Sequence, residues 1–344
     1  MSLTEHVLNQ DRSMLRKKLI AMIAAAAFTV TGLSGCTFDG KQVIFTTGKM
    51  PGTVFRIGKL SCSRKTARVY LANYYNIYGK TGDICLWEQN LNTSRLVQNI
   101  RKAAIDRLSV VYALNLYADE NDIDLTSQEE SLVEKAAGSY YGSLSANDRK
   151  ALDVSESDIR GMYEKEALAS KVYTKIVSKA DDEVSDEEAR VMDAVLITFE
   201  AGDETDADKA LRELDDGTDI SIVAKEYSTD KKTSVNICRS SYPDEICNVA
   251  FALDENEYST PVTTKDGTYI IYCVSKFDEA KSDENRTNII NSRKKKVMDS
   301  IIEKQNQKDY SYIDENAWKD ISEKLGHEID TDSFFSTLSD NISF

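Results

Sequence analysis

Histidine is nearly absent from this chain: His6 and His327 are its two histidines among 344 residues. Imidazole is the commonest transition-metal ligand, and zinc sites are built from closely spaced cysteine and histidine. The five cysteines that follow Cys36 show no such spacing. The sequence therefore argues against a zinc site, and we predict neither a metal nor a cofactor.

Positive charge is also in deficit, because 43 Lys and Arg residues face 58 Asp and Glu residues and give a net charge of −15. Proteins that bind phosphate backbones gather basic residues on one surface. The composition argues against nucleic acid as a partner. It favours cationic segments of unfolded polypeptides instead.

A long hydrophobic run is missing as well. The apolar run Leu19–Val30 holds 12 residues, whereas a spanning helix needs roughly 20. It follows the basic cluster Met14–Lys18 and precedes Leu33-Ser34-Gly35-Cys36. This order is typical of a secretory signal, and the last four residues resemble the bacterial lipobox. The resemblance implies cleavage before Cys36 and lipidation of its thiol.

We therefore predict a signal segment over residues 1–36 and a chain anchored through Cys36 to the outer face of a bacterial cell membrane. The true start is Met1 or Met14, because the signal pattern is complete from Met14. A buried core helix is the alternative for this stretch. The cations before it and the lipobox after it disfavour that alternative.

Residues 37–183 are predicted to form a helical domain, after a short strand near Val54. The helix Leu96–Tyr117 is the strongest of these, with apolar residues on one face. Capping-box patterns at Thr126 and Ser155 predict two more helix starts. Four tyrosines share one helical stretch: Tyr70, Tyr74, Tyr75 and Tyr78. They are interpreted as helix-packing residues, with the lining of a groove for unfolded chains as the alternative.

Residues 184–280 have a different pattern, which predicts an inserted α/β domain and an α+β fold class for the whole chain. Its order is strand, helix, short helix, loop, helix and strand. The run Ala194–Ile197 is too short for a buried helix and is predicted as a central strand. Helices are expected over Thr205–Leu214 and Ile220–Tyr227. The dipeptide Asp266-Gly267 predicts a tight turn before the strand Tyr269–Val274.

Five segments of this block resemble the parvulin family of peptidyl-prolyl isomerases: Asp193–Ile197, Ala224–Asp230, Ala250–Leu253, Ser259–Val262 and Gly267–Ile271. The resemblance implies a small antiparallel sheet flanked by helices, and isomerisation of X-Pro bonds. It further implies catalytic roles for Asp230, Thr264 and Tyr269. Tyr242, Ile246 and Phe251 fall where the family builds its apolar proline pocket.

The chain departs from the family at three points. Ala194 and Tyr269 stand where parvulins carry two histidines, and Ser234–Cys238 replaces the family's glycine pair. Losing a hydrogen bond in a buried network costs about 1 to 3 kcal/mol. The site is therefore either a weakened isomerase or a domain that only binds. The alternative for Asp230, in the segment Ser-Thr-Asp, is a structural role as a turn or helix-cap residue.

The order of signal, helical domain, parvulin unit and returning helix resembles the PrsA and SurA type of extracytoplasmic foldases. The resemblance implies that residues 281–344 return to the N-terminal domain, beginning with a helix over Asn285–Lys304. Ser311–Phe344 either completes that domain or extends from it. The implied partners are unfolded or newly exported polypeptides with proline-containing segments.

Two other functions are compatible with the sequence. One is a holdase whose parvulin unit is catalytically silent. The other is a solute-binding lipoprotein of a transporter, which would need two lobes of alternating strand and helix. For the cysteines, Cys62 with Cys85 and Cys238 with Cys247 are the first pairs to consider as disulfides. Cys273 is then a free thiol, and five reduced cysteines are the alternative.

Overall fold

The computed structural model describes residues 37–38, 41–42, 44–45, 52–81, 84–85, 94–308, 311–324 and 329–344. The predicted signal segment and Cys36 lie outside these residues. The chain divides into two compact units: unit 1 holds Met1–Lys179 and Val297–Phe344, and unit 2 holds Ala180–Lys296. Within the described residues, no helix combines the length and apolar character that crossing a membrane requires.

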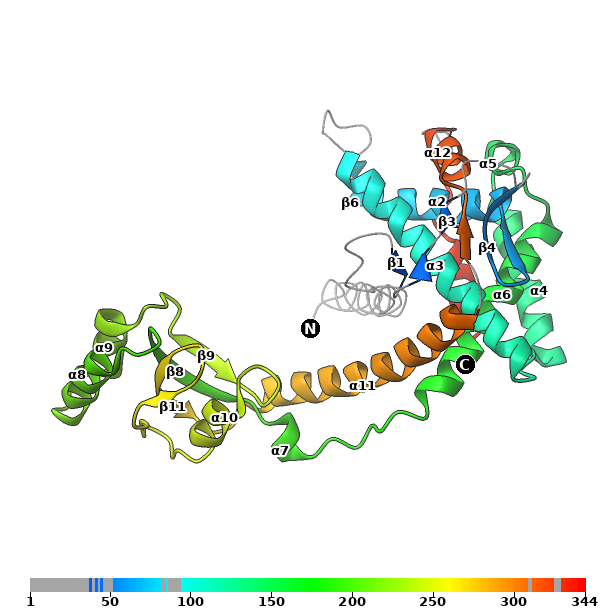
Figure 1. Cartoon of the computed structure of the whole chain (residues 1–344). Helices are drawn as coiled ribbons and strands as arrows, with labels where there is room; N and C mark the ends of the chain where they lie inside the picture. The colour runs from blue at the N-terminus through cyan, green and yellow to red at the C-terminus, as the bar shows by residue number, and fades with distance from the viewer. Residues whose placement is uncertain are drawn as a thin grey trace, which may run out of the picture. The chain divides into compact units, whose positions relative to one another are not determined.

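Unit 1 is mainly helical (Figure 1). Its helices are α2 (Arg64–Gly79), α3 (Ser94–Glu120), α4 (Ser127–Ser143), α5 (Ala146–Leu152), α6 (Glu156–Val177), α12 (Glu315–Lys324) and α13 (Phe334–Asn341). Its strands are β1 (Thr37–Phe38), β2 (Lys41–Gln42), β3 (Ile44–Phe45), β4 (Thr53–Ile57), β5 (Leu60–Ser63), β6 (Lys80–Thr81), β7 (Ile84–Cys85) and β12 (Ser311–Ile313). A small sheet has the order β3-β12-β4-β5, so a strand from the C-terminal part lies between N-terminal strands.

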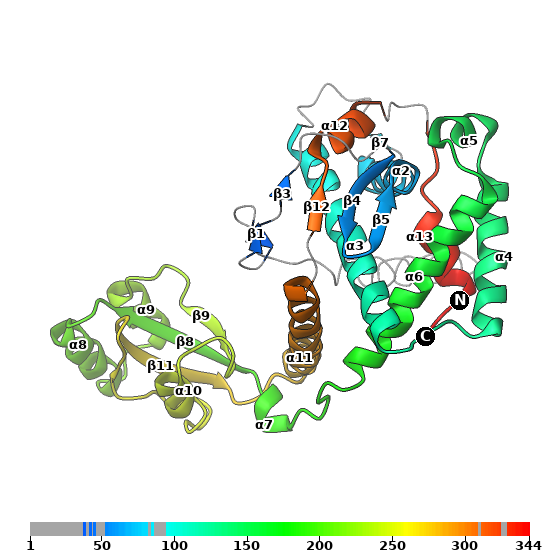
Figure 2. The ribbon, with the colours of Figure 1, turned by 45° about the vertical axis from the view of Figure 1, so that its right-hand side comes forward.

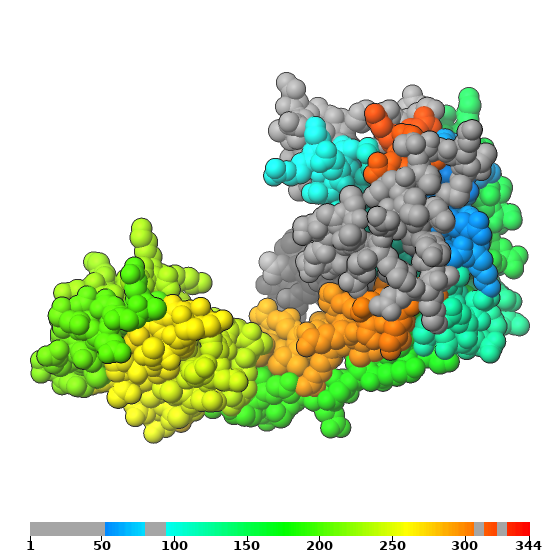
Figure 3. Space-filling view, viewed as in Figure 1, coloured from blue at the N-terminus to red at the C-terminus, as the bar shows by residue number. Residues whose placement is uncertain are grey.

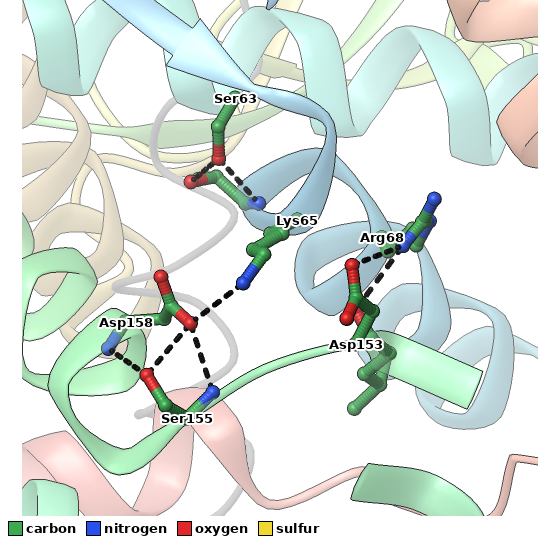
Figure 4. A network of polar contacts seen from close by, with 8 residues as sticks. Ser63, Lys65, Arg68, Asp153, Ser155 and Asp158 are labelled. Carbon is green, nitrogen blue, oxygen red and sulfur yellow. Dashed lines mark hydrogen bonds and ion pairs between the residues drawn. The ribbon is translucent and has the colours of Figure 1, made fainter. Parts of the chain in front are cut away.

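The helix starts of unit 1 follow from local sequence. Thr126 and Ser155 form capping boxes with Glu129 and Asp158, as the spacing predicts. Lys65 of α2 then reaches the second box, with its Nζ 3.0 Å from a carboxylate oxygen of Asp158 (Figure 4). The start of α6 is thereby tied to α2.

The predicted face of α3 is confirmed, since Ile100, Ala104, Leu108 and Val111 are all buried. These residues belong to one apolar core that also includes α2, α4, α6 and the C-terminal segment. Within unit 1, Phe334 is fully buried, so the segment completes the core rather than extending from it.

Unit 2 contains a four-stranded antiparallel sheet with the order β10-β11-β8-β9 (Figure 2). Its strands are β8 (Met192–Phe199), β9 (Ser234–Ile237), β10 (Val262–Thr263) and β11 (Thr268–Ser275). Its helices are α7 (Asp186–Ala189), α8 (Glu204–Asp215), α9 (Ile220–Tyr227), α10 (Asp244–Ala250) and the first part of α11 (Glu279–Lys308). In Figure 3 the green and yellow segments of unit 2 pack together into one body.

The two faces of this sheet bury different side chains, because alternate residues of a strand point to opposite sides. Ile197 and Phe199 pack with α8 and α9. Ala194 and Leu196 pack with α10. The α+β class is confirmed. The structure adds two strands to the expected order: β9, where the sequence predicts a loop over Ser234–Cys238, and β10 before the last strand.

The cysteines of unit 2 do not form the disulfide considered above. Cys238, Cys247 and Cys273 are buried free thiols, and so is Cys62 in unit 1. Cys247 Sγ donates weakly to the carbonyl oxygen of Tyr242, at 3.4 Å. Burial raises the pKa of the Cys247 and Cys273 thiols, which keeps them protonated and unreactive.

Candidate active site

Ala194 and Tyr269, which the resemblance matches to two histidines of the parvulin family, lie on the same face of the sheet, beneath α10. Ala194 of β8 is buried, and Tyr269 of β11 is half-buried against the same apolar cluster. In the strand register Tyr269 pairs with Thr198, whereas Ala194 pairs with Cys273. Of these two residues, Tyr269 carries a polar side-chain group and Ala194 does not.

Asp230 lies on a loop that is held beside the last residues of β8, beyond the part of β8 that pairs with β9. The backbone N–H of Thr229 donates to the carbonyl oxygen of Thr198 at 2.8 Å. The N–H of Thr198 in turn donates to Ser228 Oγ at 3.1 Å. These bonds fix the backbone on one side of Asp230 while its side chain stays exposed.

Tyr242 and Tyr269 pack against the same apolar cluster beneath α10. Burial raises the pKa of the Tyr242 hydroxyl, and the negative charge of Asp230 raises it further. Of the residues named from the sequence, the structure thus brings Tyr242 and Tyr269 to one cluster.

Ile246 and Phe251 contribute apolar surface at different depths. Ile246 is 1% exposed, so it lies inside the cluster beneath any pocket rather than on its surface. The ring of Phe251 is half-buried, with the guanidinium carbons of Arg190 and Arg239 at 4.7 and 5.1 Å from its centroid. These arginines could not be identified from the sequence, because the residues around them give no sign of a contact with Phe251.

Thr264 has a role in the backbone turn between β10 and β11. Its N–H donates to the carbonyl oxygen of Gly267 at 2.9 Å, and its Oγ1 accepts from the N–H of Asp266 at 3.1 Å. A Cβ on Gly267 would lie 2.6 Å from the carbonyl oxygen of Phe199, so the turn requires glycine there. The Thr264 hydroxyl is engaged in holding this turn.

The arrangement suits a reaction without covalent chemistry. It offers apolar surface from α10, a tyrosine hydroxyl on the sheet and a carboxylate at the edge. Among the residues that the structure describes, no group of three or more His, Cys, Asp or Glu side chains is placed to hold a metal ion. Rotation about an amide bond needs a desolvated pocket and a few polar contacts rather than a nucleophile.

Residues 154–284 match the family of PPIC-type PPIase domains, and this range includes all four strands of the unit 2 sheet. The chain therefore carries a parvulin-type peptidyl-prolyl isomerase domain.

The chain is also similar to curated and solved PrsA proteins. The chain is 31% identical over 114 residues to the foldase protein PrsA of Clostridium kluyveri, which covers 29% of this chain and 33% of that protein. It is 22% identical over 333 residues to the foldase protein PrsA of Clostridium acetobutylicum, covering 84% and 94%. The solved PrsA peptidylprolyl isomerase of Bacillus anthracis is 21% identical, with a TM-score of 0.34 and coverage of 58% and 97%. The chain is thus similar in sequence to PrsA foldases. Its first alignment spans about a third of that relative's length.

Proposed function

We propose that this chain is an extracytoplasmic foldase that isomerises X-Pro bonds in exported polypeptides and holds those polypeptides while they fold. The observation that carries the proposal is the match to a PPIC-type domain, in which Tyr242 and Tyr269 pack against one apolar cluster. A lipid on Cys36 would keep the chain at the outer face of the membrane.

The chemistry asked of the site is modest. Rotation about the X-Pro bond faces a barrier of roughly 18 to 20 kcal/mol, because the twisted amide loses its resonance. A thousandfold acceleration requires about 4 kcal/mol of preference for the twisted form. The apolar surface near Phe251 would seat the proline ring. Asp230, Tyr242 and Tyr269 would supply polar contacts to the amide as its charge distribution changes.

Exchange NMR on an X-Pro peptide, with the full chain as catalyst, tests the isomerase. We expect Asp230→Ala to lower kcat/KM by about 5- to 100-fold, since it removes roughly 1 to 3 kcal/mol of polar contact. Asp208→Ala changes another exposed aspartate, on α8, and serves as the matched control. Equal activity of the two variants would remove Asp230 from the mechanism.

A silent holdase is the second candidate, and it is favoured by the resemblance that matches Ala194 to a histidine of the family. Peptide binding without acceleration in the same experiment would establish it. The solute-binding alternative has less support, because the unit 2 sheet is antiparallel and unit 1 is mainly helical within the described residues.

The lipid anchor has a separate test. Metabolic labelling with a palmitate analogue should label the parent chain in a lipoprotein-processing bacterium. Cys36→Ser should lose the label and be released from the membrane fraction. A membrane-bound Cys36→Ser chain would show that the anchor lies elsewhere.

A further inference from the structure

Two arginine side chains of unit 2 border Phe251, the ring that the resemblance places in the proline pocket. The guanidinium carbon of Arg190 lies 4.7 Å from the ring centroid, and that of Arg239 lies 5.1 Å from it. Met192 of β8 pairs with Ile237 of β9, so Arg190 and Arg239 both extend past the same end of this strand pair. An aromatic face attracts cations. Phe251 therefore helps to hold two positive charges beside the candidate pocket.

One carboxylate serves both of these arginines. Glu187 of α7 places Oε1 2.7 Å from Nη2 of Arg239 and Oε2 3.6 Å from Nη1 of Arg190. Among the residues that the structure describes, neither arginine forms an ion pair with any other carboxylate. Two positive charges thus face one negative charge, and this part of the domain keeps a local excess of positive charge.

The two arginines differ in how accessible they are. The side chain of Arg190 is 16% exposed, and its Nε donates to the carbonyl oxygen of Lys276 at 3.0 Å. The side chain of Arg239 is 39% exposed, and its hydrogen bond to Glu187 uses Nη2. A guanidinium carries several N–H donors in a planar fork. Arg239 can therefore bind a second carboxylate while it keeps Glu187.

We infer that Arg239 is a specificity-determining residue that selects X-Pro segments with an aspartate or glutamate beside the proline, an assignment that rests on the proposed isomerase function. A proline ring seated against Phe251 would bring the neighbouring side chains of the substrate close to Arg239, because Arg239 lies over the same ring. Guanidinium and carboxylate form charge-assisted, often bidentate hydrogen bonds. The net charge of −15 repels acidic polypeptides. Arg239 offsets that repulsion where the substrate is bound.

Two proline peptides test this inference with the full chain as catalyst. One has glutamate on both sides of the proline, and the other has glutamine there, so the two peptides match in size and differ in charge. Exchange NMR measures kcat/KM for both, and NMR titration measures their affinities. The readout is the ratio of the glutamate peptide to the glutamine peptide. A partly unfolded variant lowers both values together, so the ratio reports on selection alone.

We expect the parent chain to favour the glutamate peptide about three- to fivefold at low salt, and this preference should shrink as salt screens the charges. Arg239→Gln should remove the preference, whereas Arg239→Lys should keep part of it because it retains the charge. Arg212→Gln is the matched control. Arg212 is an exposed arginine of α8, which packs on the other face of the sheet, so this variant should keep the parent's ratio.

Equal values for the two peptides with the parent chain at low salt would overturn the inference. A preference that survives in Arg239→Gln would overturn it too, and so would a preference that Arg212→Gln also removes, since the overall charge of the chain would then be its cause. If neither peptide is isomerised faster by the parent chain, the proposed isomerase is refuted. The ratio of affinities then still judges the role of Arg239 separately.

Discussion

At the scale of single residues, the most demanding feature of unit 1 is a buried charge. Glu166 is 1% exposed and accepts hydrogen bonds from Arg107 through both carboxylate oxygens. The Tyr70 hydroxyl donates to the same carboxylate, and burial together with the charge of Glu166 raises the pKa of Tyr70. A buried carboxylate is tolerated only with such partners.

Replacing Arg107 by leucine should therefore destabilise the protein strongly. The expected loss is about 3 to 5 kcal/mol in the free energy of unfolding, because Glu166 stays buried without its cation. Arg160→Leu is the matched control, since Arg160 pairs with Glu164 at the surface. Its expected effect is below about 1 kcal/mol. Denaturant titration measures both, and comparable losses would contradict the argument.

The neighbourhood of Tyr242 gives a second prediction at this scale. Asp230→Asn removes a negative charge that disfavours the tyrosinate, so the pKa of Tyr242 should fall. Part of the elevation should remain, because burial is its larger cause. NMR titration with ring-labelled tyrosine follows the change, and Asp208→Asn is the control. An unchanged pKa of Tyr242 in Asp230→Asn would show that the charge of Asp230 does not act on Tyr242.

How far the sequence predicts the residue scale depends on how local the signal is. The apolar face of α3 was predictable from spacing alone. The burial of Glu166 was not predictable, because a glutamate in a helix usually faces water. Only the folded positions of Tyr70 and Arg107 stabilise its buried carboxylate. Of the candidate site residues, Asp230 and Tyr242 came from resemblance. Their electrostatic link emerged only from the folded domain.

At the scale of elements, helix starts carry strong local information. The box at Ser155 has both reciprocal bonds: the Ser155 N–H donates to Asp158 Oδ2 at 2.8 Å and the Asp158 N–H donates to Ser155 Oγ at 3.2 Å. Strand β9 is the opposite case. Ser234 and Asn236 are exposed, while Val235 is partly buried and Ile237 is fully buried. Four residues with two apolar side chains give only a weak strand signal, so their pairing with β8 is a tertiary property.

Ser155→Ala should cost about 1 kcal/mol of stability through loss of the cap. Ser157→Ala is its matched control, because Ser157 is exposed in the first turn of the same helix. Its expected change is within about 0.5 kcal/mol. Thermal unfolding of the two variants measures the difference. If Ser155→Ala costs no more stability than Ser157→Ala, the side-chain cap is not what fixes the start of α6.

The same box makes the stability of α6 dependent on pH. Burial opposes ionisation of Asp158, but bonds from Ser155 and the ammonium of Lys65 lower its pKa overall. A lowered native pKa adds stability at pH values above the unfolded pKa of about 3.9, and this stability is lost as the pH falls through the native pKa. The stability difference between the parent and Asp158→Ala should therefore shrink in acid. A difference that stays constant down to acid unfolding would assign the role of Asp158 to packing.

At the scale of the whole chain, the two units have separate cores. The core cluster of unit 1 contains Leu108, and that beneath α10 in unit 2 contains Ile271. Calorimetry should therefore resolve two unfolding transitions. Leu108→Ala should lower the free energy of unfolding of unit 1 by about 2 to 5 kcal/mol. Ile271→Ala should lower that of unit 2 by a similar amount. A single transition that moves with both variants would show that the units unfold together.

The position of β12 also sets an order of events during synthesis. β12 lies between β3 and β4, so residues 311–313 complete a sheet whose other strands belong to the first 63 residues. A chain growing from its N-terminus cannot close that sheet until residues 311–313 have been made. All strands of the unit 2 sheet, in contrast, are present once Ser275 has been added. Unit 2 is therefore able to fold first, although unit 1 begins earlier in the sequence, and the sheet of unit 1 stays incomplete until β12 has been synthesised.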